Sequence, residues 1–286
     1  MTDKTFCPAQ IGDALLNPYM GWVPMATKVG HKQPHTMVYA PLIWSQLEPE
    51  ERGRFDWDGF EDRCNFKHWK EYGVRINIRF YMDQPTMKPH MDIPKWLYEM
   101  LGGDGDVPAG TSPMPDTYKG EPYDSCIGVG YTPNYADPVL IREHERVVEA
   151  IAKRYGEDPS IAFIQIGSLG HWGEWHCWPY TKEEGGPSGT FPRTDIADIY
   201  VSHYLKNFDR RKLCMRRPTG PAASNGLGLF NDMFGDVPAS KEVGNAWYEW
   251  FKKGYRDARG EEMPAMPDFW KRGVSGGEFA NGNAGM

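Results

Sequence analysis

Residues 171 to 176 bring together, in one short loop, groups that can transfer protons, bind metal or stack on a ligand. They are His171, Trp172, Gly173, Glu174, Trp175 and His176. Glycines at positions 170 and 173 permit the positive φ angles that let a backbone approach a ligand closely. We expect this loop to form half of an active site, with the other half near the end of the chain.

The loop follows a short apolar run, Ile161 to Ile166, which is rich in β-branched residues and stops at Gly167. This pattern predicts a buried strand that presents the loop. Glu278 lies in a second predicted strand, residues 273–280, where an unpaired buried carboxylate would be costly. We favour a functional role for Glu278 over a structural ion pair with Arg79 or Arg216.

Other candidate residues fall near the ends of predicted strands. Arg79 and Arg216 are expected to pair with carboxylates there and to favour their charged form. Asp83 and Asp232 end two strands and are candidates to bind hydroxyl groups, although Asp at such positions often caps a turn. The tryptophans expected at a ligand are Trp44, Trp172 and Trp175.

The two histidines of the loop are five residues apart, which differs from the i, i+4 spacing of helical zinc ligands. No third ligand is evident, so we predict neither a metal nor another cofactor and assign both histidines to orienting Glu174. Cys177 has no base partner and is not expected to be a nucleophile. The five cysteines are scattered, which is typical of free thiols.

The composition excludes some partners and favours another. The net charge of −7 argues against nucleic acid and anionic membranes as partners. Aromatic residues make up 14% of the chain, with 11 Trp and 15 Tyr, and their flat faces suit sugar rings. We expect a carbohydrate partner; the sequence leaves the oligomeric state open. Without an apolar signal core or a long apolar run, the chain is expected in the cytoplasm, or secreted if a leader was removed.

Strand and helix patterns alternate along the chain. Strands are predicted at 17–26, 36–44, 74–82, 161–166, 212–216, 227–233 and 273–280, and helices at 57–72, 138–155, 193–208 and 242–255. Alternation of this kind without hairpin signals predicts a parallel sheet. Seven repeats favour a single α/β domain over residues 1–286, a (β/α)8 TIM barrel truncated after the seventh strand, with a long active-site loop at 84–137.

Three stretches together resemble a known superfamily. The segment 39–57, with Trp-Ser-Gln-Leu-Glu-Pro and Gly-Arg-Phe-Asp-Trp, is similar to the segment after strand two of clan A (β/α)8 retaining glycoside hydrolases. Residues 164–174 resemble strand four of these enzymes, and residues 276–279 resemble strand seven. The strings Gly-His-Trp-Gly-Glu-Trp-His and Gly-Gly-Glu-Phe-Ala most resemble an uncharacterised bacterial β-galactosidase-like family.

The resemblance implies a two-carboxylate mechanism. It gives Glu174 the role of general acid/base, which requires a raised pKa, and Glu278 that of the nucleophile. The sequence departs from the superfamily pattern because Gly173, rather than Asn, precedes Glu174. Two alternatives therefore stay open: a carbohydrate-binding barrel without catalysis, and a metal-dependent hydrolase that uses His171 and His176.

Overall fold

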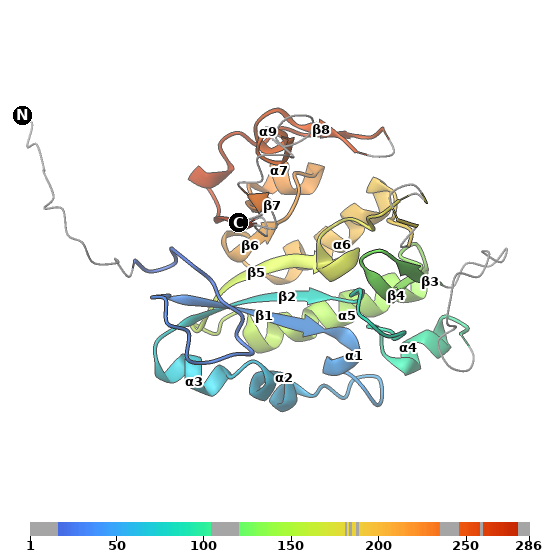
Figure 1. Cartoon of the computed structure of the whole chain (residues 1–286), viewed down its shortest axis with the longest axis horizontal. Helices are drawn as coiled ribbons and strands as arrows, with labels where there is room; N and C mark the ends of the chain where they lie inside the picture. Colours follow the sequence, from blue (N-terminus) through green and yellow to red (C-terminus); the bar gives the residue numbers. More distant parts are fainter. Residues whose placement is uncertain are drawn as a thin grey trace, which may run out of the picture.

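Parallel strands form the centre of the molecule (Figure 1). The computed structural model describes residues 17–103, 120–180, 182, 185–186, 189–234, 246–257 and 260–279. Within them, six strands form one sheet: β1 (Met37–Ile43), β2 (Arg75–Tyr81), β5 (Ile161–Ser168), β6 (Leu213–Met215), β7 (Gly228–Phe234) and β10 (Ser275–Phe279).

The strand order in this sheet is the order in the chain, β1-β2-β5-β6-β7-β10, and every pairing is parallel. Each new strand adds on the same side, as in a (β/α) barrel, whereas a doubly wound sheet reverses direction. The predicted α/β barrel class is therefore correct. Six of the seven predicted strands are these strands, and the first, at 17–26, is reduced to one parallel bridge between Met25 and Tyr39.

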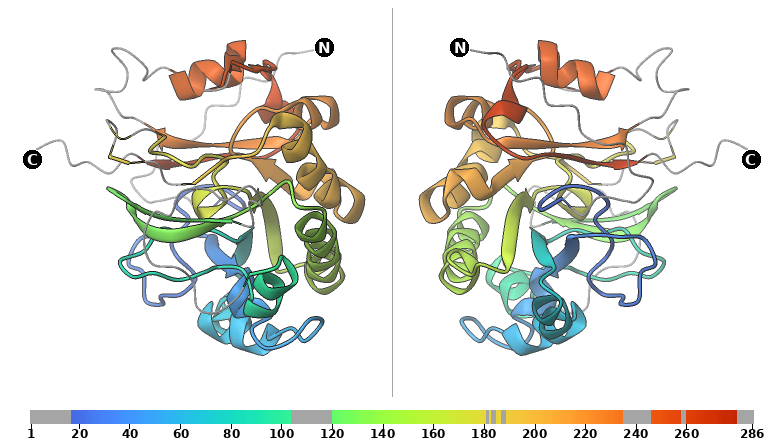
Figure 2. Two further views of the ribbon diagram at one scale, coloured as in Figure 1. Left: turned by 90° about the vertical axis from the view of Figure 1, so that its right-hand side faces the viewer. Right: turned by 90° about the vertical axis from the view of Figure 1, so that its left-hand side faces the viewer.

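The sheet is curled rather than flat. Strands β2 and β10 are four positions apart in the sheet, which would separate them by ~19 Å if it were flat. Yet a side chain from each meets at 2.7 Å, between Arg79 and Glu278. The views in Figure 2 show helices on the outer side of this curled sheet.

The helices fill the connections between strands. They are α1 (Trp44–Leu47), α2 (Trp57–Arg63), α3 (Phe66–Glu71), α4 (Lys95–Met100), α5 (Pro138–Tyr155), α6 (Thr194–Asn207), α7 (Gly220–Asn225) and α9 (Ala246–Lys253), with short 3-10 turns η1 (His171–Gly173), η2 (Arg210–Lys212) and η3 (Phe269–Lys271). The single helix predicted at 57–72 is divided into α2 and α3 because Asn65 adopts a left-handed conformation, with φ of 52°. Helix α5 has the predicted bounds, with Asp137 capping its first turn.

Strand β2 shows how the sequence separates the two faces of the sheet. Phe80 points outward and packs on His144 of α5, whereas Arg79 points inward onto Tyr39 and Phe230. Both faces are buried, as expected for a parallel sheet covered by helices. Alternation in this strand therefore separates an apolar outer layer from a polar interior.

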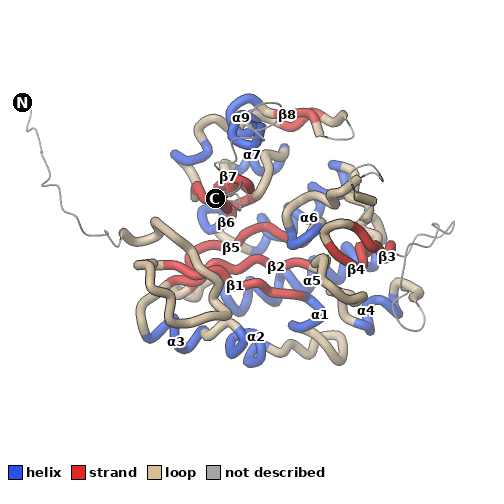
Figure 3. The backbone as a smooth tube through the Cα atoms, viewed as in Figure 1, coloured by secondary structure: helices blue, strands red, loops and turns tan. Residues whose placement is uncertain are grey.

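The prediction that hairpins are absent was wrong. Strands β3 (Gly120–Ser125) and β4 (Gly128–Pro133) pair antiparallel inside the long loop 84–137, and β8 (Tyr255–Arg256) pairs with β9 (Glu262–Met263). Figure 3 shows the β3–β4 hairpin beyond the carboxyl ends of β1 and β2. Its Gly, Pro and Asp residues have low strand propensity, which hid the pattern. In the described part of the chain, every helix is too short or too polar to cross a bilayer.

Candidate active site

The guanidinium of Arg79 joins the two carboxylates singled out in the sequence. Its Nη1 donates to Glu174 Oε1 at 3.2 Å, and its Nη2 donates to Glu278 Oε1 at 2.7 Å. Arg79 lies in β2, Glu174 follows β5 and Glu278 lies in β10. Three strands thus place these groups at the end of the sheet where active sites of parallel barrels form.

Hydrogen bonds and aromatic rings hold the side chain of Arg79 in place. Its Nε donates to Gln165 Oε1 at 2.6 Å, and its guanidinium carbon lies 5.0 Å from the ring centre of Tyr39 and 4.8 Å from that of Phe230. Aromatic faces stabilise a cation by about 0.5–2 kcal/mol each. Only 3% of Arg79 is exposed. Burial lowers its pKa, but Tyr39 and the carboxylates of Glu278 and Glu174 outweigh this effect and raise the pKa above its usual value.

Glu174 has two further partners. Arg216, directly after β6, lies 3.5 Å from Oε2, and His176 Nε2 lies 3.3 Å from the same oxygen. The backbone N–H of Trp178 donates to His176 Nδ1 at 3.2 Å, so the hydrogen-bond network assigns the ring proton to Nε2. His176 therefore donates to Glu174 as a neutral ring. Burial lowers its pKa to about 4.

These contacts keep Glu174 ionised. Burial opposes its charge, but the His176 hydrogen bond and the charges of Arg216 and Arg79 lower its pKa to about 2. A resting proton donor needs the opposite shift. The raised pKa that we expected for Glu174 is therefore wrong for the protein as it stands, because two guanidiniums face this carboxylate.

The loop that carries Glu174 has an unusual backbone. Gly170 and Gly173 adopt φ angles of 72° and 69°, as their sequence positions indicated, and Ser168, Trp172 and Trp175 also have positive φ. Such conformations cost about 1–3 kcal/mol each in non-glycine residues and cluster at functional sites. A Cβ on Gly173 would lie 2.8 Å from Gly167 Cα, so the turn also needs glycine for space.

Glu278 lies at an irregularity of its strand. The register between β10 and β7 shifts between Gly277 and Phe279, and such a bulge redirects a side chain. Its side chain is 45% exposed, compared with 10% for Glu174. Glu278 is therefore the more accessible of the two carboxylates.

Two of the side chains that were predicted to contact a ligand are buried in the structure. Trp44 is fully buried and donates its ring N–H to Glu48 at 3.0 Å, so it belongs to the core. Asp83 is also fully buried, and its two oxygens accept from Tyr123 at 2.7 Å and Thr132 at 2.6 Å. Both predictions were wrong because each side chain is already enclosed by protein. The side chain of Asp232 lies outside the described residues.

The other two tryptophans flank the loop. Trp172 is partly exposed, and its backbone carbonyl accepts from Arg79 at 3.4 Å. Trp175 is 4% exposed and donates its ring N–H to the Ile166 carbonyl at 2.8 Å. A hollow of about 290 Å³ lies beside Trp175 and is also lined by Phe191, Tyr255 and Arg217. A larger hollow, about 750 Å³, lies around η2, before the start of β6, away from the carboxylates.

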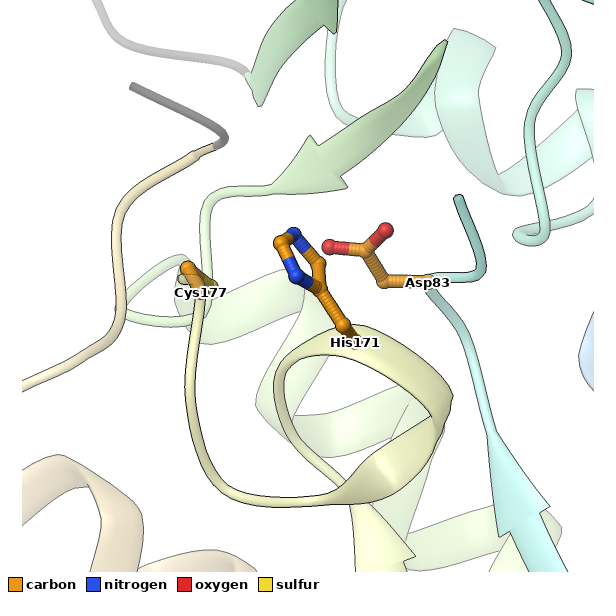
Figure 4. Close-up of side chains that lie close together, drawn as sticks. All are labelled: Asp83, His171 and Cys177. Carbon is orange, nitrogen blue, oxygen red and sulfur yellow. The ribbon is translucent and has the colours of Figure 1, made fainter. Parts of the chain in front are cut away.

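His171 and His176 do not converge on one point. His176 uses its two nitrogens for Glu174 and the Trp178 N–H, whereas His171 lies close to Asp83 and Cys177 (Figure 4). The two rings are in contact, with their centres 5.7 Å apart, but they have different polar neighbours. His176 contacts Glu174, as expected, whereas the ring of His171 lies beside Asp83 and Cys177, so an orienting role of His171 toward Glu174 stays a prediction.

Sequence reasoning missed the residues that hold Arg79. Gln165, Tyr39 and Phe230 lie within strands that appear only apolar or amphipathic. One signal was present: Gln165 is the single polar residue in the run Ile161 to Ile166, and a polar residue in a buried strand needs a partner.

The comparisons with known proteins give structural likenesses alone. No family model matches the chain, and no curated protein matches it. Solved structures that are similar include a GH5_18 from Bifidobacterium longum subsp. infantis, with 12% identity and a TM-score of 0.46 over 86% of this chain and 61% of that one. Endo-glycoceramidase II from Rhodococcus sp. has 13% identity and a TM-score of 0.44 over 86% and 65%.

A third similar structure is a GH5_18 protein from Streptomyces cattleya in complex with Manb1-4GlcNAc. It has 10% identity and a TM-score of 0.38, over 68% of this chain and 36% of that one. The chain thus spans less than two thirds of the length of each of these three proteins. Because the identities are below 25% and the TM-scores below 0.5, the likenesses assign neither a substrate nor a residue role.

Proposed function

We propose that the protein hydrolyses glycosidic bonds with Glu174 and Glu278 as its two working carboxylates. The observation that carries this proposal is their shared partner: both accept a hydrogen bond from one guanidinium, that of Arg79. Two carboxylates on one side of a barrel, close to a common centre, are what glycoside hydrolysis requires.

In this proposal Glu278 is the nucleophile. Its ion pair with Arg79, at 2.7 Å, holds the carboxylate in place, and its exposure leaves it open to a substrate. The resemblance to clan A retaining glycosidases supports the same role. Retention of anomeric configuration is part of the proposal.

Glu174 is proposed as the acid/base. Since Arg79 and Arg216 stabilise its ionised form in the free protein, a bound substrate must displace at least one of these contacts before Glu174 can hold a proton. The hollow beside Trp175 supports a sugar ligand, because aromatic walls accompany polar groups there.

A second candidate function is carbohydrate binding without turnover. The lowered pKa of Glu174 favours it, because an ionised carboxylate held by two arginines can accept hydrogen bonds from sugar hydroxyls but cannot donate a proton. The two functions differ in one measurable respect, which is product formation.

The experiment is a screen of chromogenic glycosides with the whole chain, followed by variants on the best substrate. Glu278→Gln is expected to reduce kcat at least about 100-fold with every leaving group. Glu174→Gln is expected to lower kcat/KM strongly with a poor leaving group but much less with dinitrophenolate, which departs without a proton. A 2-deoxy-2-fluoro glycoside should leave a covalent adduct on Glu278, seen by mass spectrometry of peptides.

The control is Glu50→Gln, an exposed carboxylate whose ion-pair partner, among the residues that the structure describes, is Arg54. It should match the wild type in every assay. Turnover that survives in Glu278→Gln would remove the nucleophile, and an inverted product would remove retention. Sugar binding detected by calorimetry, with no turnover of any glycoside, would establish the binding function instead.

A further inference from the structure

Three side chains with metal-ligating atoms lie close together at the loop 171–177, which carries Glu174. They are the carboxylate of Asp83, the imidazole of His171 and the thiol of Cys177, and each residue is fully buried. Figure 4 shows the ring of His171 between Asp83 and Cys177. Asp83 follows β2, whereas His171 and Cys177 lie on either side of Glu174 in the sequence.

The three ligand atoms are close enough for one ion. All of them lie within 4.8 Å of one another, so some point is within about 2.8 Å (4.8 Å divided by √3) of all three. Zinc bonds to oxygen, nitrogen and sulfur are about 2.0 to 2.3 Å long. Each side chain therefore needs to move by at most about 0.8 Å (2.8 Å minus 2.0 Å) to bind an ion at that point.

The surroundings favour a cation. Within the described residues, Asp83 forms no ion pair with Lys or Arg; it accepts hydrogen bonds from the hydroxyls of Tyr123 and Thr132, on the β3–β4 hairpin. Buried carboxylates are normally paired or bound to a metal. Each carboxylate oxygen accepts one of these hydrogen bonds and has a second lone pair left for an ion.

We propose that Asp83, His171 and Cys177 form a binding site for a divalent transition-metal ion of the zinc class. Thiolate and imidazole ligands select zinc over magnesium or calcium, which prefer oxygen. Burial raises the pKa of the Asp83 carboxyl to about 8, so binding at neutral pH converts both this carboxyl and the Cys177 thiol to their anions and releases the two protons to solvent. The fourth position of a tetrahedral ion stays open to water.

The ion would act as a positioning group for Glu174. It connects the residues just after β2 with both sides of the loop 171–177. The structure also joins this loop to β2 through Arg79, which donates to Glu174 and to the Trp172 carbonyl, and joins it to Asp83 through the Trp172 N–H at 2.8 Å. A metal bond at each side of Glu174 would fix the strained turn that presents this carboxylate to Arg79. This site differs from the paired-histidine site considered from the sequence, and it does not depend on the proposed glycosidase activity.

The test is a titration of the whole, chelator-treated protein with zinc against a chromophoric chelator, and with cobalt as a spectroscopic probe. We expect one ion per chain with a dissociation constant of about 1 µM or tighter, and a cobalt–thiolate charge-transfer band. Zinc should also raise the thermal midpoint. Cys177→Ser should weaken binding at least about 100-fold and abolish the band, and His171→Gln should weaken binding.

The matched control is Cys126→Ser, which removes an exposed thiol outside the cluster. It should keep the affinity and the band. A wild-type protein that binds no zinc, or a band that disappears in Cys126→Ser, would overturn the site. If Cys177→Ser does not fold, the cobalt spectra of the wild type and of Cys126→Ser still decide, because neither needs a change in the cluster.

Discussion

Arg79 of β2 and Glu278 of β10 form an ion pair of 2.7 Å between strands that are four positions apart in the sheet. Burying a guanidinium costs several kcal/mol. Two carboxylates, the Gln165 oxygen and two aromatic faces offset this cost at Arg79. One buried cation therefore brings together the two acidic groups of the site and links β2 to the strand farthest from it in the chain.

Replacing this cation should be costly even when its charge is kept. Arg79→Lys retains one positive charge but cannot reach both carboxylates and Gln165 with a single ammonium group. Because breaking a buried pair costs about 3–5 kcal/mol, we expect the free energy of unfolding to fall by about 3 kcal/mol. Urea denaturation measures this change.

The control for that variant is Arg211→Lys. The side chain of Arg211 is 82% exposed and, in the described part of the chain, forms an ion pair with Asp209 alone, so the unfolding free energy of this variant should change by less than about 0.5 kcal/mol. Similar losses in the two variants would mean that Arg79 does not hold the site together.

The two glutamates should differ in what they contribute to stability. Glu174→Gln leaves buried Arg216 and Arg79 without one carboxylate, whereas Glu278→Gln removes a half-exposed partner. Removing a buried partner costs several kcal/mol, and an exposed one less than about 1 kcal/mol. We expect the larger loss in Glu174→Gln by urea denaturation, and the reverse order would contradict this view of the ion pairs.

Two glycines with nearly the same φ angle allow the cost of backbone strain to be measured separately from the cost of steric crowding. Gly73 and Gly173 have φ of 68° and 69°, but a Cβ on Gly73 meets nothing within 4 Å, whereas one on Gly173 meets Gly167 at 2.8 Å and Tyr81 at 3.1 Å. Gly73→Ala should cost about 1 kcal/mol from φ alone. Gly173→Ala should cost clearly more in thermal or urea denaturation. Equal losses of stability in the two variants would show that the turn at residue 173 accommodates a Cβ without a steric clash.

Much of the barrel could be predicted because its signals are local. The β-branched run before Gly167 and the capped periodicity of 138–155 predict β5 and α5 without knowledge of their neighbours. The hairpin β3–β4 could not be predicted in the same way. Its Gly and Pro residues have low strand propensity, and pairing across the hairpin compensates for this only in the folded chain.

The sequence was sufficient to predict the charged residues of the site, but not the groups that surround them. Glu174, Glu278, Arg79 and Arg216 stand out because charged residues are rare in buried strands and at their ends. The lowered pKa of Glu174 depends on which arginines face it, and that is set by the curl of the sheet. Trp44 shows the same limit. A tryptophan is suited to stacking on a ligand, and only the packing of α1 against α5 shows that this one belongs to the hydrophobic core.

A buried histidine pair between α5 and α6 should make stability depend on pH. His144 Nδ1 lies 2.8 Å from His203 Nδ1, which requires one of these nitrogens to be unprotonated, and His144 Nε2 lies 2.7 Å from Ser168 Oγ. Burial, and then the charge of His203, lowers the pKa of His144 well below 6.5. Below about pH 6.5 the unfolded chain therefore binds a proton that the folded chain does not, and the free energy of unfolding falls as pH falls.

One such proton changes stability by about 1.4 kcal/mol per pH unit. Other groups also titrate, so the slope that belongs to His144 is the difference between wild type and His144→Gln in urea denaturation at pH 5 to 7. We expect a shallower slope in the variant, and an unchanged slope in His68→Gln on α3, which lies outside this pair. Identical slopes in wild type and His144→Gln would mean that the α5–α6 histidines take up protons equally well in the folded and unfolded states.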